Sequence, residues 1–153
     1  EESLRIESDE QISTFFAKDT QAHGTGAAVW QSWLKALGEI KGPVHLTIDI
    51  DGLDASLVPA TGTPVPGGLT FWQAIETIEA VFAAPNATVI SADVNEIATN
   101  DHGPLTEFNA AMLATKTVAC HLKARQEGRW ISSHEAKGKQ RTGPMCGYFS
   151  QLN

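Results

Sequence analysis

The feature that most constrains this chain is a short apolar run, Val44 to Ile50, which leads directly into a group of acidic residues. A β-branched run of this length predicts a buried strand. Because side chains alternate along a strand, we expect Asp49 and Asp51 on one face, roughly 6–7 Å apart. Two carboxylates so placed repel each other unless a cation neutralises them, and oxygen ligands suit Mg, Ca or Mn. The alternative is a solvated turn after the strand.

The order of the expected elements indicates an α/β fold with a parallel sheet. We expect a strand at 12–16, a helix at 27–37, a strand at 44–50, a helix at 70–83, a strand from 88 and a helix at 106–126. The Pro- and Gly-rich loop before Gly68 is long for such a connection, which favours a functional role. Three strands leave open sheet edges, and a parallel sheet needs cover on both faces. The pattern therefore predicts a missing partner segment.

Composition narrows the class of protein. The 153 residues suggest one domain, and the net charge of −7 argues against nucleic-acid binding. No apolar run approaches the length of a membrane span. The start of the chain lacks a signal-peptide pattern, and the two cysteines suggest no disulfide framework, so we expect a cytoplasmic protein. The residues from Arg129 onward carry +3, which suggests a docking arm or a solvated tail.

One motif resembles a known family signature. It comprises Thr47 to Asp51, followed by Ala55, Pro59–Ala60 and Gly68 at their spacings. It is similar to the third signature of the ureohydrolases, a family that includes arginases, agmatinases and formimidoylglutamases. The continuation to Thr70 looks particularly like arginase, and Ser91 to Glu96 lies where those enzymes carry Glu-Val-Asn-Pro.

This resemblance implies a three-layer α-β-α fold. Residues 1–127 would supply the carboxyl-terminal half of the domain, and residues 128–153 a basic tail or docking arm. The family's Gly-Gly-Asp-His and Asp-Ala-His-x-Asp motifs are absent from this sequence, so a complementary amino-terminal half or a second chain would complete the site. The resemblance also implies a homo-oligomer, a trimer or a hexamer.

The resemblance also implies a chemistry. Two Mn²⁺ ions per complete site would activate a water that attacks the carbon of a guanidino or formimino compound, giving urea or formamide plus an amine. It implies that Asp49 and Asp51 are metal ligands and that Thr63 and Asp93 contact the substrate, with Glu96 and His102 as further candidates. It identifies no side chain as a catalytic acid or base.

Two features leave alternatives open. Asp93 stands where the family has Glu, and Glu96 replaces Pro, which favours an inactive subunit kept for structure or regulation. The Asp-x-Asp-Gly pattern after an apolar strand also resembles haloacid-dehalogenase-type phosphohydrolases, in which Asp49 would be the nucleophile. His45 shares the face of the acids but is expected to be a buried, hydrogen-bonded histidine. The tryptophans and Phe71 are expected in the core.

Overall fold

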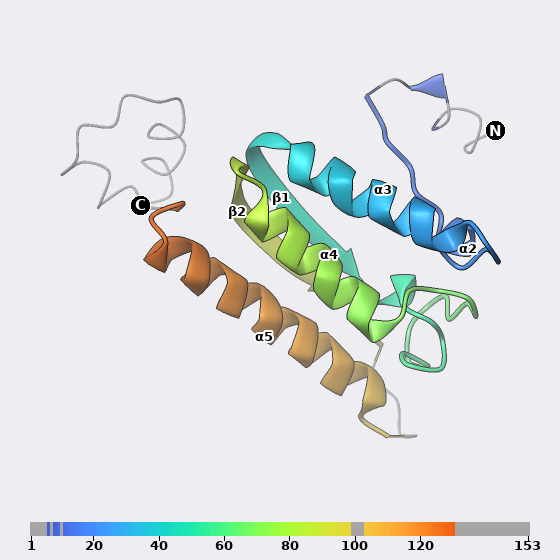
Figure 1. Cartoon of the computed structure of the whole chain (residues 1–153). Helices are drawn as coiled ribbons and strands as arrows, with labels where there is room; N and C mark the ends of the chain where they lie inside the picture. The colour runs from blue at the N-terminus through green and yellow to red at the C-terminus, as the bar shows by residue number, and fades with distance from the viewer. Residues whose placement is uncertain (1–5, 7, 10, 99–102, 131–153) are drawn as a thin grey trace.

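The computed structural model describes residues 6, 8–9, 11–98 and 103–130 (Figure 1). Its elements, in chain order, are α2 (Ala17–Thr20), α3 (Gly26–Glu39), β1 (Lys41–Asp49), the 3-10 turn η1 (Ile50–Gly52), α4 (Phe71–Ala83), β2 (Asn86–Asn95) and α5 (Leu105–Gln126). Strands β1 and β2 run parallel and are joined through α4. The predicted α/β class with a parallel sheet is confirmed.

The helices lie on one face of the sheet. In Figure 1, α4 lies over the strands, between α3 and α5. On β1, Val44, Leu46 and Ile48 pack against the helices, because every second side chain points to that side. The intervening residues on β1 are exposed, His45, Thr47 and Asp49 among them. Within the described residues there are thus two layers, helices and sheet, and the second face of the sheet is open.

Apolar burial and specific polar contacts hold the layers together. The core includes Ile50, Ile78, Val81, Val89 and Leu113, each at most 7 % exposed. Two indole N–H groups of α3 donate to side chains of α4, Trp30 to Glu76 at 2.7 Å and Trp33 to Thr77 at 3.0 Å. An ion pair between Lys116 and Glu79 links α5 to α4.

Two expectations about the fold are wrong. Residues 12–16 form no strand, so the described residues contain two strands rather than three. Ile12 and Phe16 are 48 % and 44 % exposed, because an apolar run becomes a strand only where a neighbouring strand pairs with it. Trp72 is 71 % exposed instead of belonging to the core.

No helix in the described part of the chain has both the length and the apolar character needed to cross a bilayer.

Candidate functional site

The predicted metal ligands lie where β1 ends. Asp49 is exposed and is the last residue of the strand, which ends one residue earlier than predicted. Ile50 begins the turn η1, and its side chain is completely buried. Asp51 therefore lies in a turn rather than on the strand, and the expectation that both acids share one strand face is wrong. Ile50 still continues the inward alternation of Leu46 and Ile48, and the turn is closed by a hydrogen bond of 3.1 Å from the Leu53 amide to the Ile50 carbonyl.

Thr63, predicted to contact substrate, lies next to Asp51. Its hydroxyl donates a hydrogen bond of 2.6 Å to Asp51 Oδ2. The loop that carries Thr63 thus reaches back to the end of β1 and fixes one of the two acids. The structure brings together a predicted metal ligand and a predicted substrate contact, separated by twelve positions in sequence.

The loop between Leu53 and Leu69 is closed on itself by Asp54. The Asp54 carboxylate accepts hydrogen bonds from the Ser56 hydroxyl at 2.5 Å, the Ser56 amide at 2.9 Å and the Gly67 amide at 2.7 Å. These bonds, led by that of the Ser56 hydroxyl, hold the pKa of Asp54 below its ordinary value of 3.8. Asp54 therefore serves to shape the loop.

The loop is also held against the ends of β2 and α5. The Ala60 amide donates to the buried Thr106 hydroxyl at 2.9 Å, and the Ala98 amide donates to the Ala60 carbonyl at 2.9 Å. Between these contacts, Glu96 has a φ of 62°, which is uncommon for a residue with a side chain. The Glu96 carboxylate lies near Gly62, with Oε2 4.0 Å from where a Cβ of that residue would lie.

Asp93 lies in a polar network on the open face of the sheet. Its Oδ1 accepts a hydrogen bond of 2.7 Å from Asn95, and its Oδ2 lies 3.2 Å from His45 Nε2. The Asn95 amide also donates to the Thr47 hydroxyl at 3.2 Å. The pKa of Asp93 is held below 3.8, chiefly by the Thr47 hydroxyl and further by Asn95 and His45, while desolvation opposes this.

His45 differs from its expectation. It is hydrogen-bonded as predicted, to the Ser91 hydroxyl at 2.7 Å, but its side chain is 53 % exposed instead of buried. The sequence indicates only that His45 shares a strand face with Thr47, two residues later. It does not indicate that His45 contacts Ser91 and Asp93 on β2. His102 lies outside the described residues.

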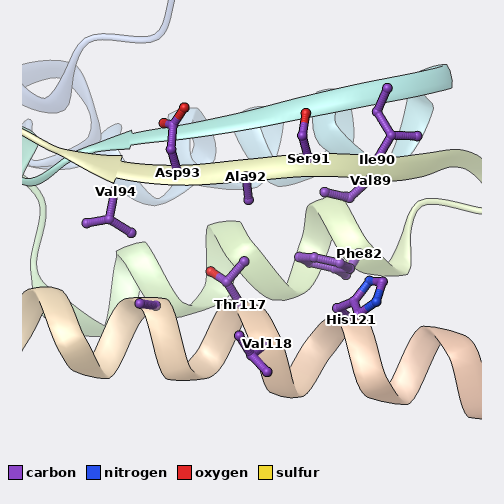
Figure 2. A pocket seen from close by; sticks show the side chains of 11 residues that line it. Phe82, Val89, Ile90, Ser91, Ala92, Asp93, Val94, Thr117, Val118 and His121 are labelled. Carbon is purple, nitrogen blue, oxygen red and sulfur yellow. The ribbon is translucent and has the colours of Figure 1, made fainter. Parts of the chain in front are cut away.

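A groove runs along β2 on the side of the sheet facing α5 (Figure 2). It encloses about 400 Å³. Most of its lining is apolar: Phe82, Val89, Ala92, Val94, Ala114 and Val118. Figure 2 shows Ala92 and Val94 pointing toward α5, while Ser91 and Asp93 point the other way. The strand therefore separates an apolar groove from a polar face.

The family that fits this arrangement is identified by comparison with known proteins. The family model described as "Arginase family" matches residues 1–120. The chain belongs to the arginase family. Among its relatives, the N(1)-aminopropylagmatine ureohydrolase of Thermus thermophilus is 35 % identical over 133 residues, which cover 86 % of this chain and 41 % of that protein. Mitochondrial arginase-2 of Rattus norvegicus is 32 % identical over 79 % of this chain and 34 % of its own length.

Solved arginase-family structures have the same fold. A hypothetical agmatinase from Burkholderia thailandensis has a TM-score of 0.63 at 31 % identity, covering 78 % of this chain and 36 % of that one. Arginase from Bacillus caldovelox has a TM-score of 0.61 at 29 % identity, covering 76 % and 38 %. This arginase-family chain thus spans about two fifths of the length of the curated relatives it matches.

The acids at the end of β1 have the chemistry of metal ligands, but they are few. Asp49 and Asp51 offer the oxygen ligands that Mn²⁺ accepts. Across the described residues, however, no three His, Cys, Asp or Glu side chains gather closely enough to hold a metal ion. The two aspartates can therefore contribute ligands but cannot form a complete coordination shell.

Proposed function

We propose that this chain is the carboxyl-terminal part of a binuclear manganese ureohydrolase, which hydrolyses the C–N bond of a guanidino or formimino compound. The observation that carries the proposal is that, in an arginase-family chain, Thr63 binds Asp51 directly after β1. Asp93 lies on the neighbouring strand, opposite Thr47. Because the chain belongs to the arginase family, the Asp-x-Asp-Gly pattern no longer favours a haloacid-dehalogenase-type phosphohydrolase.

In the proposed site, Asp49 and Asp51 are metal ligands, and the Thr63 hydroxyl orients Asp51 through its 2.6 Å hydrogen bond. When bound, the two manganese ions supply an activated water and electrostatic stabilisation of developing charge. The Asp93 carboxylate attracts the cationic guanidinium or amidine group of the substrate. Glu96 adds a second negative charge beside the loop.

The remaining ligands come, in this proposal, from a complementary amino-terminal half or a second chain. Two observations support this: the chain spans about two fifths of its relatives, and an apolar groove follows β2. Val118 is 58 % exposed, and covering such apolar side chains with a further segment stabilises the protein. We further propose that the complete protein is a cytoplasmic trimer or hexamer.

Calorimetric titration with Mn²⁺ tests the metal site. We expect weak binding by the isolated chain, because two carboxylates leave most coordination positions unfilled. In the completed assembly we expect two tightly bound ions, and Asp49→Asn or Asp51→Asn should remove this binding. Glu39→Gln, at the exposed end of α3, is the charge-matched control and should change nothing. Tight binding of two ions by the isolated chain would refute the proposal of an incomplete site.

A second candidate is an inactive ureohydrolase-like subunit with a structural or regulatory role. The observation that favours it is the shortened carboxylate of Asp93, which Asn95 and His45 hold against the sheet. The two candidates differ in one measurement on the completed, manganese-loaded assembly. Release of urea or formamide from guanidino or formimino compounds supports the enzyme, and its absence supports the inactive subunit.

A further inference from the structure

The side chains of β2 change faces part-way along the strand. Val89 is 7 % exposed and belongs to the core under the helices. In an unbroken strand, every second residue after Val89 would face the same way, including Ser91 and Asp93. Figure 2 shows the opposite: Ser91 and Asp93 point away from α5. The alternation must therefore be interrupted between Val89 and Ser91.

The interruption is a one-residue irregularity in the pairing of the strands. Val44 pairs with Val89, but the next residue of β1, His45, pairs with Ser91. Ile90 is therefore the extra residue of a β-bulge. A shift of one residue moves all following side chains to the other face. Consequently Asp93 lies opposite Thr47, and Asn95 lies opposite Asp49, all on the open face.

His45 bonds to the strand directly after this bulge. Its Nδ1 shares a hydrogen bond of 2.7 Å with the hydroxyl of Ser91, and its Nε2 lies 3.2 Å from Asp93 Oδ2. A neutral imidazole satisfies both contacts, because its Nε2–H donates a hydrogen bond to the carboxylate while its Nδ1 accepts a hydrogen bond from the hydroxyl. One side chain of β1 thus holds two successive outward-facing residues of β2.

We propose that the bulge at Ile90 is what turns Asp93 onto the site face, and that His45 is a positioning residue that locks this register and orients the Asp93 carboxylate. Asn95 holds Oδ1 and His45 holds Oδ2, so the carboxylate is fixed from both sides. Since a carboxylate has about four acceptor sites, it keeps capacity for a cationic group. This last consequence for ligand binding rests on the proposed function.

The competing interpretation is that the backbone pairing alone sets the register and that His45 is incidental. Exposed ion pairs often contribute little to stability, and the side chains of His45 and Asp93 are 53 % and 43 % exposed. The two ring contacts of His45 can be separated by mutation. His45→Asn keeps an amide near the position of Nδ1, beside Ser91, whereas His45→Gln places an amide N–H near the position of Nε2, beside Asp93. His45→Leu removes both contacts.

The test uses the full 153-residue chain without metal or substrate. Amide hydrogen exchange reports the register at residues 91–95, with residues 86–89 of the same strand as an internal reference. Carbon-13 NMR of the Asp93 carboxyl group reports its pKa. His23→Leu, which alters an exposed histidine in the turn before α3, is the matched control.

With His45→Leu we expect exchange at 91–95 to quicken about three- to tenfold relative to 86–89, the factor that corresponds to losing one net hydrogen bond. We also expect the pKa of Asp93 to rise, but only part of the way to its ordinary value, because the Thr47 hydroxyl, the largest cause of the lowered pKa, and Asn95 remain. His45→Asn should restore the exchange protection, and His45→Gln should restore the pKa. The proposal is overturned if His45→Leu matches His23→Leu in both readouts, or if neither conservative variant rescues either one. Because no metal or substrate is present, failure of the ureohydrolase proposal leaves these outcomes unaffected.

Discussion

At the scale of single residues, Gly68 shows how tightly the site loop is closed. A Cβ at this position would lie 2.4 Å from the Leu53 carbonyl carbon and 2.6 Å from the Asp54 amide nitrogen. Both are backbone atoms, which cannot rotate away as a flexible side chain can. The loop can therefore pass beside the end of η1 only where no side chain is present. This passage allows Leu69 to pair with Leu53 and Asp54 to bond the Gly67 amide.

Gly68→Ala should consequently destabilise the chain by roughly 1–3 kcal/mol, the usual cost of overpacking. Gly52→Ala is the matched control, because a Cβ there has no heavy atom within 4 Å and neither glycine has a positive φ. The free energy of unfolding of Gly52→Ala should stay within about 0.5 kcal/mol of that of the parent chain. Urea unfolding followed by circular dichroism measures both. Equal effects of the two substitutions would contradict the steric account.

A motif with fixed spacing selected Asp49, Asp51 and Thr63 as site candidates, and Thr63 and Asp51 do lie in contact. Their arrangement could not be predicted from the sequence. Because Ile50 continues the inward alternation of Leu46 and Ile48, the apolar run gives no sign that the strand ends at Asp49 and that a 3-10 turn begins at Ile50. Likewise, the β-bulge at Ile90 depends on pairing with β1, and the residue itself gives no turn signal. The partners of His45 follow from that bulge, so the sequence did not reveal them.

At the scale of elements, the helices were more predictable than the strands. A helix was predicted at 106–126, and α5 spans Leu105–Gln126. A helix was also predicted at 70–83, and α4 spans Phe71–Ala83 with Thr70 as its N-cap. Such ends are encoded by local hydrogen bonds, whereas the predicted strand at 12–16 required a distant partner. Local signals therefore fixed α4 and α5, and non-local pairing decided the sheet.

The cap of α4 yields a prediction at this scale. The Thr70 hydroxyl accepts from the Gln73 amide at 3.2 Å, and the Gln73 side chain accepts from the Thr70 amide at 2.9 Å. Thr70→Ala should cost about 0.5–2 kcal/mol of unfolding free energy, because an amide of the first turn loses its acceptor. Thr70→Ser keeps the hydroxyl and should retain most of the stability in denaturant unfolding. A serine variant as unstable as the alanine variant would instead implicate the lost methyl group.

At the scale of the whole molecule, two features of β2 are incomplete within the described residues. Among these residues, the strand pairs only with β1, which leaves its other edge available to a further strand, and a groove lined by residues from β2, α4 and α5 lies along it. The chain covers 36 % of the Burkholderia thailandensis agmatinase and 42 % of a Bacillus subtilis arginase. We therefore expect this groove to become interior when the rest of such a fold is joined to the chain.

A chimera tests this expectation: the amino-terminal part of the Burkholderia thailandensis agmatinase is placed ahead of this chain. Val118→Asp should then cost at least about 2 kcal/mol of unfolding free energy, because an unpaired carboxylate would be buried in an apolar groove. In the chain alone the same change should stay within about 0.5 kcal/mol, since Val118 is 58 % exposed. Ala119→Asp, on the same helix but lining a different hollow between α4 and α5, should be tolerated in both contexts. If Val118→Asp is tolerated equally in the chain and in the chimera, the groove stays open to solvent, and the complementary segment must pack elsewhere.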